Sequence, residues 1–180
     1  MCEPAHEVVM DVLLSRRSVR SYSPEPIDPA VLKQVLEAAR QAPSAANRQP
    51  WAFVVVQDPE RRRALAEACN GQLWLADAAV IVVGVGLPKV SERWYRVDVA
   101  IAMQNMVIAA SSFGLGTCWI GAFNEAKVKA LLGIPEDATV VAITPIGWPK
   151  GERPAARPRK EFEQVFYAEA YDQPLQLQQL

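Results

Sequence analysis

The chain has 180 residues, 51% of them hydrophobic, and a formal net charge of −1. A chain of this length and composition can bury a sufficient core without disulfides or a structural metal, and we expect residues 1–180 to form one domain. The near-neutral charge argues against a nucleic-acid or membrane partner, because it gives no long-range field that would attract the protein to a polyanion.

Cysteine and histidine usage excludes several kinds of site. The cysteines, Cys2, Cys69 and Cys118, include no Cys-x-x-Cys pair, and His6 is the only imidazole. We therefore expect no metal site, no disulfide framework and no catalytic Ser-His-Asp or Cys-His arrangement. The acidic N-terminal residues and the lack of a long apolar run predict a cytoplasmic protein.

Helical spacing of apolar residues predicts three helices in the first half of the chain. They are expected at residues 8–14, 29–42 and 59 to about 70. The last two follow an aspartate and begin with proline, which is a frequent helix start. Arg61, Arg62 and Arg63 lie at the start of the third helix, and we expect them on an exposed face.

Apolar and β-branched runs predict four strands, at residues 51–56, 78–86, 117–121 and 138–146. The run at 78–86 is apolar throughout, so we expect it at the centre of a sheet that is covered on both faces. Helices are expected at 95–113 and 124–132. Together these elements predict a three-layer α/β/α arrangement.

The predicted helix over 95–113 is apolar nearly all round. Asp98, Gln104 and Asn105 are its main polar interruptions. Either its own sheet or a second copy must cover such a helix, and a homodimer interface is the leading explanation.

The sequence changes in character after Gly147. Prolines alternate with basic residues from 149 to 160, which predicts an extended arm. The aromatic and aliphatic residues at 162–167 are too apolar for a free end, so we expect the arm to dock on a partner.

Two basic clusters are the main chemical signal. The first contains Arg16, Arg17, Ser18 and Arg20, and the second contains Arg157 and Arg159. Together they could bind one phosphate, because guanidinium groups match phosphate oxygens in a bidentate manner. The alternative is a solvated helix end whose cations face the negative end of the helix dipole.

Energetics indicates that such a ligand is more than a phosphate. Three charge-assisted hydrogen bonds contribute about 5–9 kcal/mol, most of which the loss of translational and rotational freedom on association offsets. The ligand must therefore also bury a large planar body. No glycine-rich nucleotide-binding loop of the Rossmann or Walker A type is present to hold it.

Three motifs, in this order, closely resemble those of the FMN-dependent nitroreductase family. They are RRSVR at 16–20, PSAANRQPW at 43–51 and GLGTCWIG at 114–121. The resemblance spans about residues 10–167. It implies an α+β fold with a central mixed, mostly antiparallel sheet and a C-terminal arm that extends onto a partner subunit. It also implies two FMN sites at a homodimer interface.

The resemblance further assigns the flavin contacts, and because the chemistry is carried by FMN N5 it assigns no catalytic side chain. The phosphate is expected to bind Arg16, Arg17, Ser18 and Arg20, together with Arg157 or Arg159. The isoalloxazine ring is expected to contact Pro43, Ser44 and Asn47 of the other subunit, and its pyrimidine edge Asn70 or Gln72. The N5 side of the ring is expected to face the backbone of Trp119, Ile120 and Gly121.

The implied activity is transfer of a hydride from NADH or NADPH to FMN and then, in a ping-pong reaction, to nitroaromatics, quinones or similar small electron-poor molecules. Two alternatives stay open: the FMN site could serve ene reduction, dehalogenation or dehydrogenation, or the protein could bind flavin without catalysis. Only the residues 87–94 separate Gly86 from Tyr95, so we expect no large lid and an exposed, loosely selective site.

Overall fold

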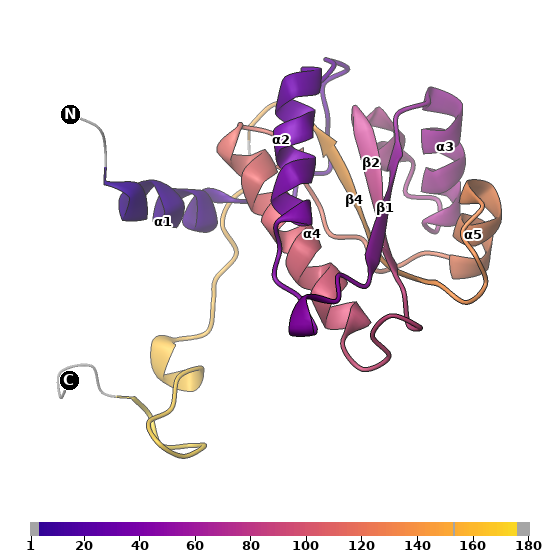
Figure 1. Cartoon of the computed structure of the whole chain (residues 1–180). Helices are drawn as coiled ribbons and strands as arrows, with labels where there is room; N and C mark the ends of the chain where they lie inside the picture. Colours follow the sequence, from indigo (N-terminus) through magenta and orange to yellow (C-terminus); the bar gives the residue numbers. More distant parts are fainter. Residues whose placement is uncertain (1–3, 153, 176–180) are drawn as a thin grey trace.

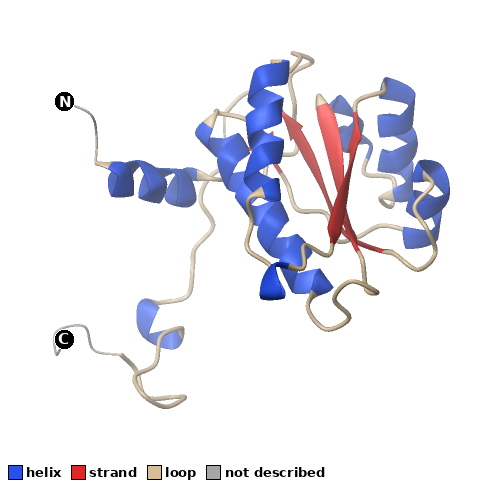
Figure 2. Cartoon of the chain, in the orientation of Figure 1, coloured by secondary structure: helices blue, strands red, loops and turns tan. Residues whose placement is uncertain are grey.

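A four-stranded sheet lies between two layers of helices in the computed structural model, which describes residues 4–152 and 154–175 (Figures 1 and 2). The strands are β1 (Trp51–Val56), β2 (Val80–Gly86), β3 (Gly116–Thr117) and β4 (Thr139–Gly147), in the order β1-β2-β4-β3. Neighbouring strands are antiparallel, and one parallel bridge joins Ser18 to Thr117. The predicted three-layer α+β fold with a mixed, mostly antiparallel sheet is confirmed.

Two helices cover one face of the sheet, and shorter elements cover the other. The first face carries α2 (Pro29–Arg40) and α4 (Tyr95–Ser112), and the second carries α3 (Pro59–Ala68), the 3-10 helix η2 (Leu73–Asp77) and α5 (Glu125–Leu132). Every residue of β2 is buried, as expected for a strand covered on both sides.

The helices begin where the capping signals place them. The Asp28 carboxylate accepts a hydrogen bond from the Ala30 amide at 2.7 Å, and Asp58 accepts one from the Arg61 amide at 2.8 Å. Each aspartate is followed by a proline at the first helical position, where no amide hydrogen is needed. The helix α1 (Ala5–Ser15) likewise ends at the basic run.

The third predicted strand is shorter than expected, because Pro145 interrupts its ladder. The pairs Gly116–Gly147, Thr117–Ile146 and Ile120–Ile143 share one register, which places Pro145 opposite Cys118. Proline has no amide hydrogen to donate to the Cys118 carbonyl. Pairing therefore stops after Thr117 and resumes only as an isolated bridge at Ile120.

The expectation that the three consecutive arginines of α3 are all exposed is wrong for Arg62. Its Nη1 donates to the carbonyl of Ala76 at 2.9 Å and also to the carbonyl of Ala78, at the end of η2. Arg61 and Arg63 are exposed as predicted. The half-buried Arg62 thus joins α3 to η2.

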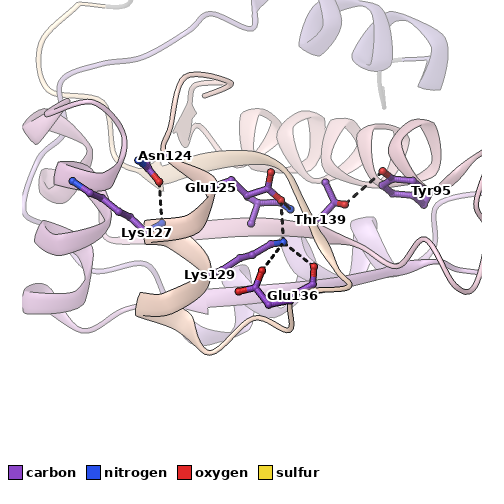
Figure 3. A network of polar contacts seen from close by, with 8 residues as sticks. Tyr95, Asn124, Glu125, Lys127, Lys129, Glu136 and Thr139 are labelled. Atoms are coloured by element: carbon purple, nitrogen blue, oxygen red, sulfur yellow. Dashed lines mark hydrogen bonds and ion pairs between the residues drawn. The ribbon is translucent and has the colours of Figure 1, made fainter.

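A polar network fixes α5 against β4 (Figure 3). Lys129 Nζ lies 3.5 Å from a Glu125 carboxylate oxygen and donates to the carbonyl of Glu136 at 3.1 Å. Glu125 also accepts from the Val140 amide at 3.0 Å, and Asn124 caps the helix by accepting from the Lys127 amide at 3.0 Å. These contacts satisfy polar groups within the fold, so we assign them a structural role.

Two segments project from the layered body. The helix α1 has no buried residue and exposes Val9 and Leu14, among others. The chain after Gly147 is extended as predicted, and Figure 1 shows it leaving the body and reaching the 3-10 helix η3 (Phe162–Gln164), which lies apart from it. Within residues 160–175, the backbone hydrogen bonds that the structure describes stay inside the segment.

Candidate functional site

The segment that follows α1 lies along the β3 edge of the sheet and is held there by two hydrogen bonds that involve Val19. The Val19 amide donates to the Thr117 carbonyl at 2.8 Å. The buried Tyr22 hydroxyl donates to the Val19 carbonyl, also at 2.8 Å. With Val19 and Tyr22 in the core, Ser18 and Arg20 remain beside a surface cavity.

That cavity brings together the two basic clusters, which are distant in sequence. It has a volume of about 210 Å³. Its lining residues are Arg16, Arg17, Ser18, Arg20, Pro154, Ala155, Arg157 and Arg159. Both arginines of the late cluster therefore reach it, and Pro154 and Ala155 were not anticipated from the sequence.

The arginines of the cavity do not all have the same freedom. Arg17 Nη1 donates to the carbonyls of Leu14 at 2.6 Å and Arg16 at 2.8 Å, so it caps the end of α1 as the helix-end alternative expected. For Arg16, Arg20, Arg157 and Arg159, no ion pair with a carboxylate occurs within residues 4–152 and 154–175. Their positive charge is available to a ligand.

A buried thiol lies directly behind this cavity. Burial raises the pKa of Cys118, whereas Arg20, a hydrogen bond with Ser18, and Arg16 act in the opposite direction. The thiol is thus held in its neutral form next to the cationic residues. Cys118 links the cavity to the chain segment that continues through residues 119–122.

The donor set and the size of the cavity fit a phosphate group. None of its described lining residues is acidic, and guanidinium and hydroxyl groups supply the donors that phosphate oxygens accept. A volume of about 210 Å³ is below the usual range for a whole cofactor. A bulky ring attached to the phosphate would lie outside the cavity, along the neighbouring surface.

Residues 119–121 continue from the cavity along the sheet edge. Trp119 is partly exposed, and its Nε1 donates to Gln104 Oε1 of α4 at 3.2 Å. Ile120 exchanges both backbone hydrogen bonds with Ile143, at 2.9 and 3.1 Å, so its amide has no capacity left for a ligand. Gly121 is exposed and has open space at its Cβ position. Of these three predicted backbone contacts, Gly121 is the one with room for a ring.

The two candidates for the far edge of the ring differ in their hydrogen bonding. The Gln72 amide nitrogen donates to the carbonyls of Cys69 at 3.0 Å and Ala122 at 3.4 Å. Asn70 is exposed, with φ of +56°. Gln72 thus lies next to the 119–122 segment, and its carboxamide oxygen, an acceptor with two lone pairs, faces no donor within residues 4–152 and 154–175.

The predicted loop at residues 43–49 lies elsewhere. The Ala45 amide donates to the Asp98 carboxylate at 3.2 and 3.3 Å, which places the loop at the N-terminal end of α4. The arginine cavity lies near the other end, because β3 follows α4 closely. At about 1.5 Å per residue, the 14 residues from Asp98 to Ser112 separate the two by about 20 Å. Pro43, Ser44 and Asn47 are therefore not part of the cavity that their own chain forms.

Two features are absent from the residues that the structure describes. No helix within residues 4–152 and 154–175 has the length and apolarity to cross a bilayer. Over the same residues, no cluster of three or more histidine, cysteine or acidic side chains could hold a metal ion.

Comparison with known proteins points in one direction. The model of the nitroreductase family matches residues 13–85 and 70–148. A provisionally named NADH dehydrogenase/NAD(P)H nitroreductase of Archaeoglobus fulgidus is 36% identical over 154 residues, which cover 82% of this chain and 88% of that protein. The FMN reductase [NAD(P)H] of Bacillus subtilis is 33% identical over 187 residues, and the match covers 91% of this chain and 74% of that protein.

A solved structure agrees with these sequence matches. The NADPH:FMN oxidoreductase of Vibrio harveyi, determined in complex with NAD+, superimposes with a TM-score of 0.84 and 28% identity. The match covers 95% of this chain and 80% of that one.

Proposed function

The chain belongs to the nitroreductase family, and from this we propose that it is an FMN-dependent NAD(P)H oxidoreductase. Its substrates would be NADH or NADPH as hydride donor and nitroaromatics, quinones or similar electron-poor molecules as acceptors. The observation that carries the proposal is the arginine cavity formed by residues 16–20 and 154–159, whose described lining contains no carboxylate. A single FMN-binding domain over residues 1–180, acting in the cytoplasm, is part of the same proposal.

The cavity residues would bind the FMN phosphate. Arg16, Arg20, Arg157 and Arg159 would supply guanidinium donors, and Ser18 would add a hydroxyl. Arg17 contributes charge, while its hydrogen bonds hold the end of α1 in place. Together they would neutralise the phosphate dianion and fix the direction in which the ring leaves the cavity.

The ring would lie along the edge formed by residues 118–122, between the cavity and Gln72. The isoalloxazine would supply the redox chemistry, a two-electron hydride exchange at N5. The Gly121 amide would donate where negative charge develops on a reduced flavin, since the space at its Cβ position is open. Gln72 and Asn70 would orient the pyrimidine edge.

We propose that a homodimer completes the site. The 43–49 loop lies about 20 Å along α4 from the cavity of its own chain. A two-fold axis across α4 would set two such helices antiparallel and bring each loop to the partner's cavity. Val97 and Ile101 of α4, 46% and 36% exposed, are available for that contact.

The projecting C-terminal segment fits the same assembly. Phe162 and Phe166 pack against each other with ring centroids 4.4 Å apart, yet both stay partly exposed, as does Val165. An apolar cluster of this kind, held away from its own core, is typical of a contact surface. We propose that it extends over the partner subunit.

An open substrate face follows from the short connection between β2 and α4. Residues 87–94 form turns there, and the Leu87 amide donates to the Pro50 carbonyl at 2.9 Å, which keeps the connection close to the body. No insertion is available in this connection to cover a ring. Donor and acceptor would therefore use one face in turn, as a ping-pong reaction requires.

Purified protein tests the proposal through its visible absorbance. We expect a flavin spectrum after incubation with FMN, and bleaching on anaerobic addition of NADH or NADPH. Nitrofurans and quinones should then restore the oxidised spectrum faster than enones or halophenols. Protein that stays colourless with FMN, or whose flavin neither nicotinamide reduces, would overturn the proposal.

A further inference from the structure

The loop at residues 43–49 is held in an unusual backbone conformation. Ala46, Asn47 and Gln49 have positive φ angles of 50°, 54° and 50°, although none of them is glycine. Such angles are disfavoured for side chains with a Cβ, and they persist only where surrounding contacts enforce them. All three residues are exposed, so packing does not supply the enforcement.

The hydrogen bonds inside the loop do not anchor it to the body. The Gln49 amide donates to Ser44 Oγ at 2.9 Å, the Asn47 amide to the Ser44 carbonyl at 2.9 Å and the Arg48 amide to the Ala45 carbonyl at 3.1 Å. These bonds give the turn its shape. They leave its position relative to α4 undetermined.

The position is set by Asp98. This aspartate lies in the first turn of α4, is only 3% exposed, and accepts the Ala45 amide with both carboxylate oxygens, at 3.2 and 3.3 Å. Within residues 4–152 and 154–175, these contacts are the only hydrogen bonds that join residues 44–48 to another element; Gln49, at the end of the turn, accepts from the Trp51 amide of β1 at 2.8 Å. Burying a carboxylate costs free energy unless hydrogen bonds replace those to water, and here the Ala45 amide supplies them.

We propose that Asp98 is a positioning residue for the flavin: it holds the Ala45 amide so that the strained, exposed 45–49 turn presents its backbone to the isoalloxazine ring. This inference rests on the proposed function, since it assumes that the ring meets this loop. Asp98 acts only through Ala45, without touching the ring. Its effect should fall on the ring and spare the phosphate, because the residues that would bind the phosphate belong to segments 16–20 and 154–159 and the 43–49 loop is not among them.

Comparing FMN with riboflavin separates these two parts of the ligand. In Asp98→Ala we expect the affinities for FMN and riboflavin to fall by the same factor, about tenfold or more, as for loss of a charged hydrogen bond. The visible circular dichroism of the bound flavin should change, because the ring environment changes. Asp98→Asn keeps an acceptor oxygen and should restore most of the affinity.

Asn105→Ala is the matched control. Asn105 also lies on α4, and its side chain donates to the Ala38 carbonyl of α2 at 3.3 Å, away from the loop. It removes a comparable bond between α4 and a neighbour, so we expect unchanged flavin affinity and circular dichroism. If Asn105→Ala lost as much flavin affinity as Asp98→Ala, the loss would reflect general damage to α4, and the inference would be overturned.

If Asp98→Ala does not fold, Ala45→Pro tests the same bond from the loop side. Proline has no amide hydrogen, so this substitution removes the donor to Asp98. Residue 45 is the first residue of the 3-10 helix at 45–47, a position that accepts the fixed φ of proline. The preceding residue, Ser44, already has the extended conformation that a following proline requires. We expect an equal loss for FMN and riboflavin. Unchanged affinities in these variants would overturn the positioning role, whereas wild-type protein that binds neither flavin would overturn the proposed function itself.

Discussion

Val19 lies so close to Gly116 that a Cβ at Gly116 would stand 2.8 Å from the Cβ and both Cγ atoms of Val19. The β3 edge can approach the 16–22 segment only because residue 116 has no side chain. Ser18 and Arg20 flank Val19 in sequence and line the cavity. The position of these cavity-lining residues thus depends on a glycine in another element.

We predict that Gly116→Ala weakens both stability and FMN binding. The added methyl has no flexible atom to displace, so we expect a loss of about 1–3 kcal/mol in the free energy of unfolding, as for overpacked cores. Displacement of Val19 should also move Ser18 and Arg20 and lower the affinity for FMN. Urea unfolding and fluorescence titration with FMN measure the two effects.

Gly121→Ala is the control for stability. Nothing lies within 4 Å of its Cβ position, so we expect a free energy of unfolding within about 0.5 kcal/mol of the wild-type value. If Gly116→Ala were as stable as Gly121→Ala, the close contact with Val19 would have no energetic consequence and the explanation would be wrong.

The late arginines should act on the phosphate alone. We predict that Arg157→Ala and Arg159→Ala each lower the affinity for FMN by about tenfold or more, since each removes a charge-assisted contact. Riboflavin, which has no phosphate, should bind these variants as it binds wild type. The FMN effect should shrink as salt is raised, because the cavity is open to solvent.

Arg63→Ala is the matched control for charge. Arg63 lies on the exposed face of α3, 3.7 Å from Glu67, far from the cavity lining. Isothermal titration calorimetry should show that Arg63→Ala binds FMN and riboflavin with the wild-type affinities. Equal losses for riboflavin and FMN in Arg157→Ala and Arg159→Ala would remove these residues from the phosphate site.

The sequence was informative wherever a local pattern decides the structure. The Asp-Pro signals place α2 and α3 correctly because the cap bonds involve neighbouring residues. The interruption of β3 could not be predicted, since it depends on Pro145 lying opposite Cys118 across the sheet. The inward turn of Arg62 likewise depends on the carbonyls at the end of η2.

For the candidate site, too, the sequence predicts the local features but not the contacts between distant segments. The arginine clusters are visible as charge runs in an otherwise neutral chain, and their meeting in one cavity is a geometric finding that adds Pro154 and Ala155. Asp98 is recognisable in sequence only as a polar interruption of an apolar helix. Its partner, the Ala45 amide, is 53 residues away and carries no side-chain signal.

A buried thiol predicts a loss of stability at alkaline pH. Burial raises the pKa of Cys69 to about 11, from an ordinary value of 9.0. Below pH 9 the thiol is neutral in both the folded and the unfolded chain. Between about pH 9 and 11 only the unfolded chain releases the proton, so the free energy of unfolding decreases as pH rises.

We therefore predict that Cys69→Ala has a flatter pH dependence than wild type. Urea unfolding under reducing conditions at pH 8, 9, 10 and 11 should give a stability difference between the two proteins that narrows above pH 9. Tyr22 and Cys118, whose pKa values burial also raises, titrate in both proteins and cancel in the difference. A difference that stays constant from pH 8 to 11 would contradict the prediction.

Mixing two inactive variants should recover activity if the site is shared between subunits. Arg20→Glu should prevent phosphate binding in the arginine cavity, and Asn47→Val should distort the 43–49 loop, because a β-branched residue is strained at the Asn47 φ of 54°. In a heterodimer of the two variants, one site combines both defects, and the other combines the intact cavity of the Asn47→Val chain with the intact loop of the Arg20→Glu chain. Each heterodimer therefore keeps one intact site of its two, so we expect about half of the wild-type activity per purified heterodimer.

Co-expression with two different affinity tags, followed by assay of the tandem-purified heterodimer with NADH or NADPH, measures this recovery. The control is a mixture of Arg20→Glu with Arg159→Glu. Both substitutions fall in the cavity that one chain forms, so every site carries a defect and no activity should return. Recovery in the control, or none with Asn47→Val, would contradict a site built from the cavity of one subunit and the loop of the other.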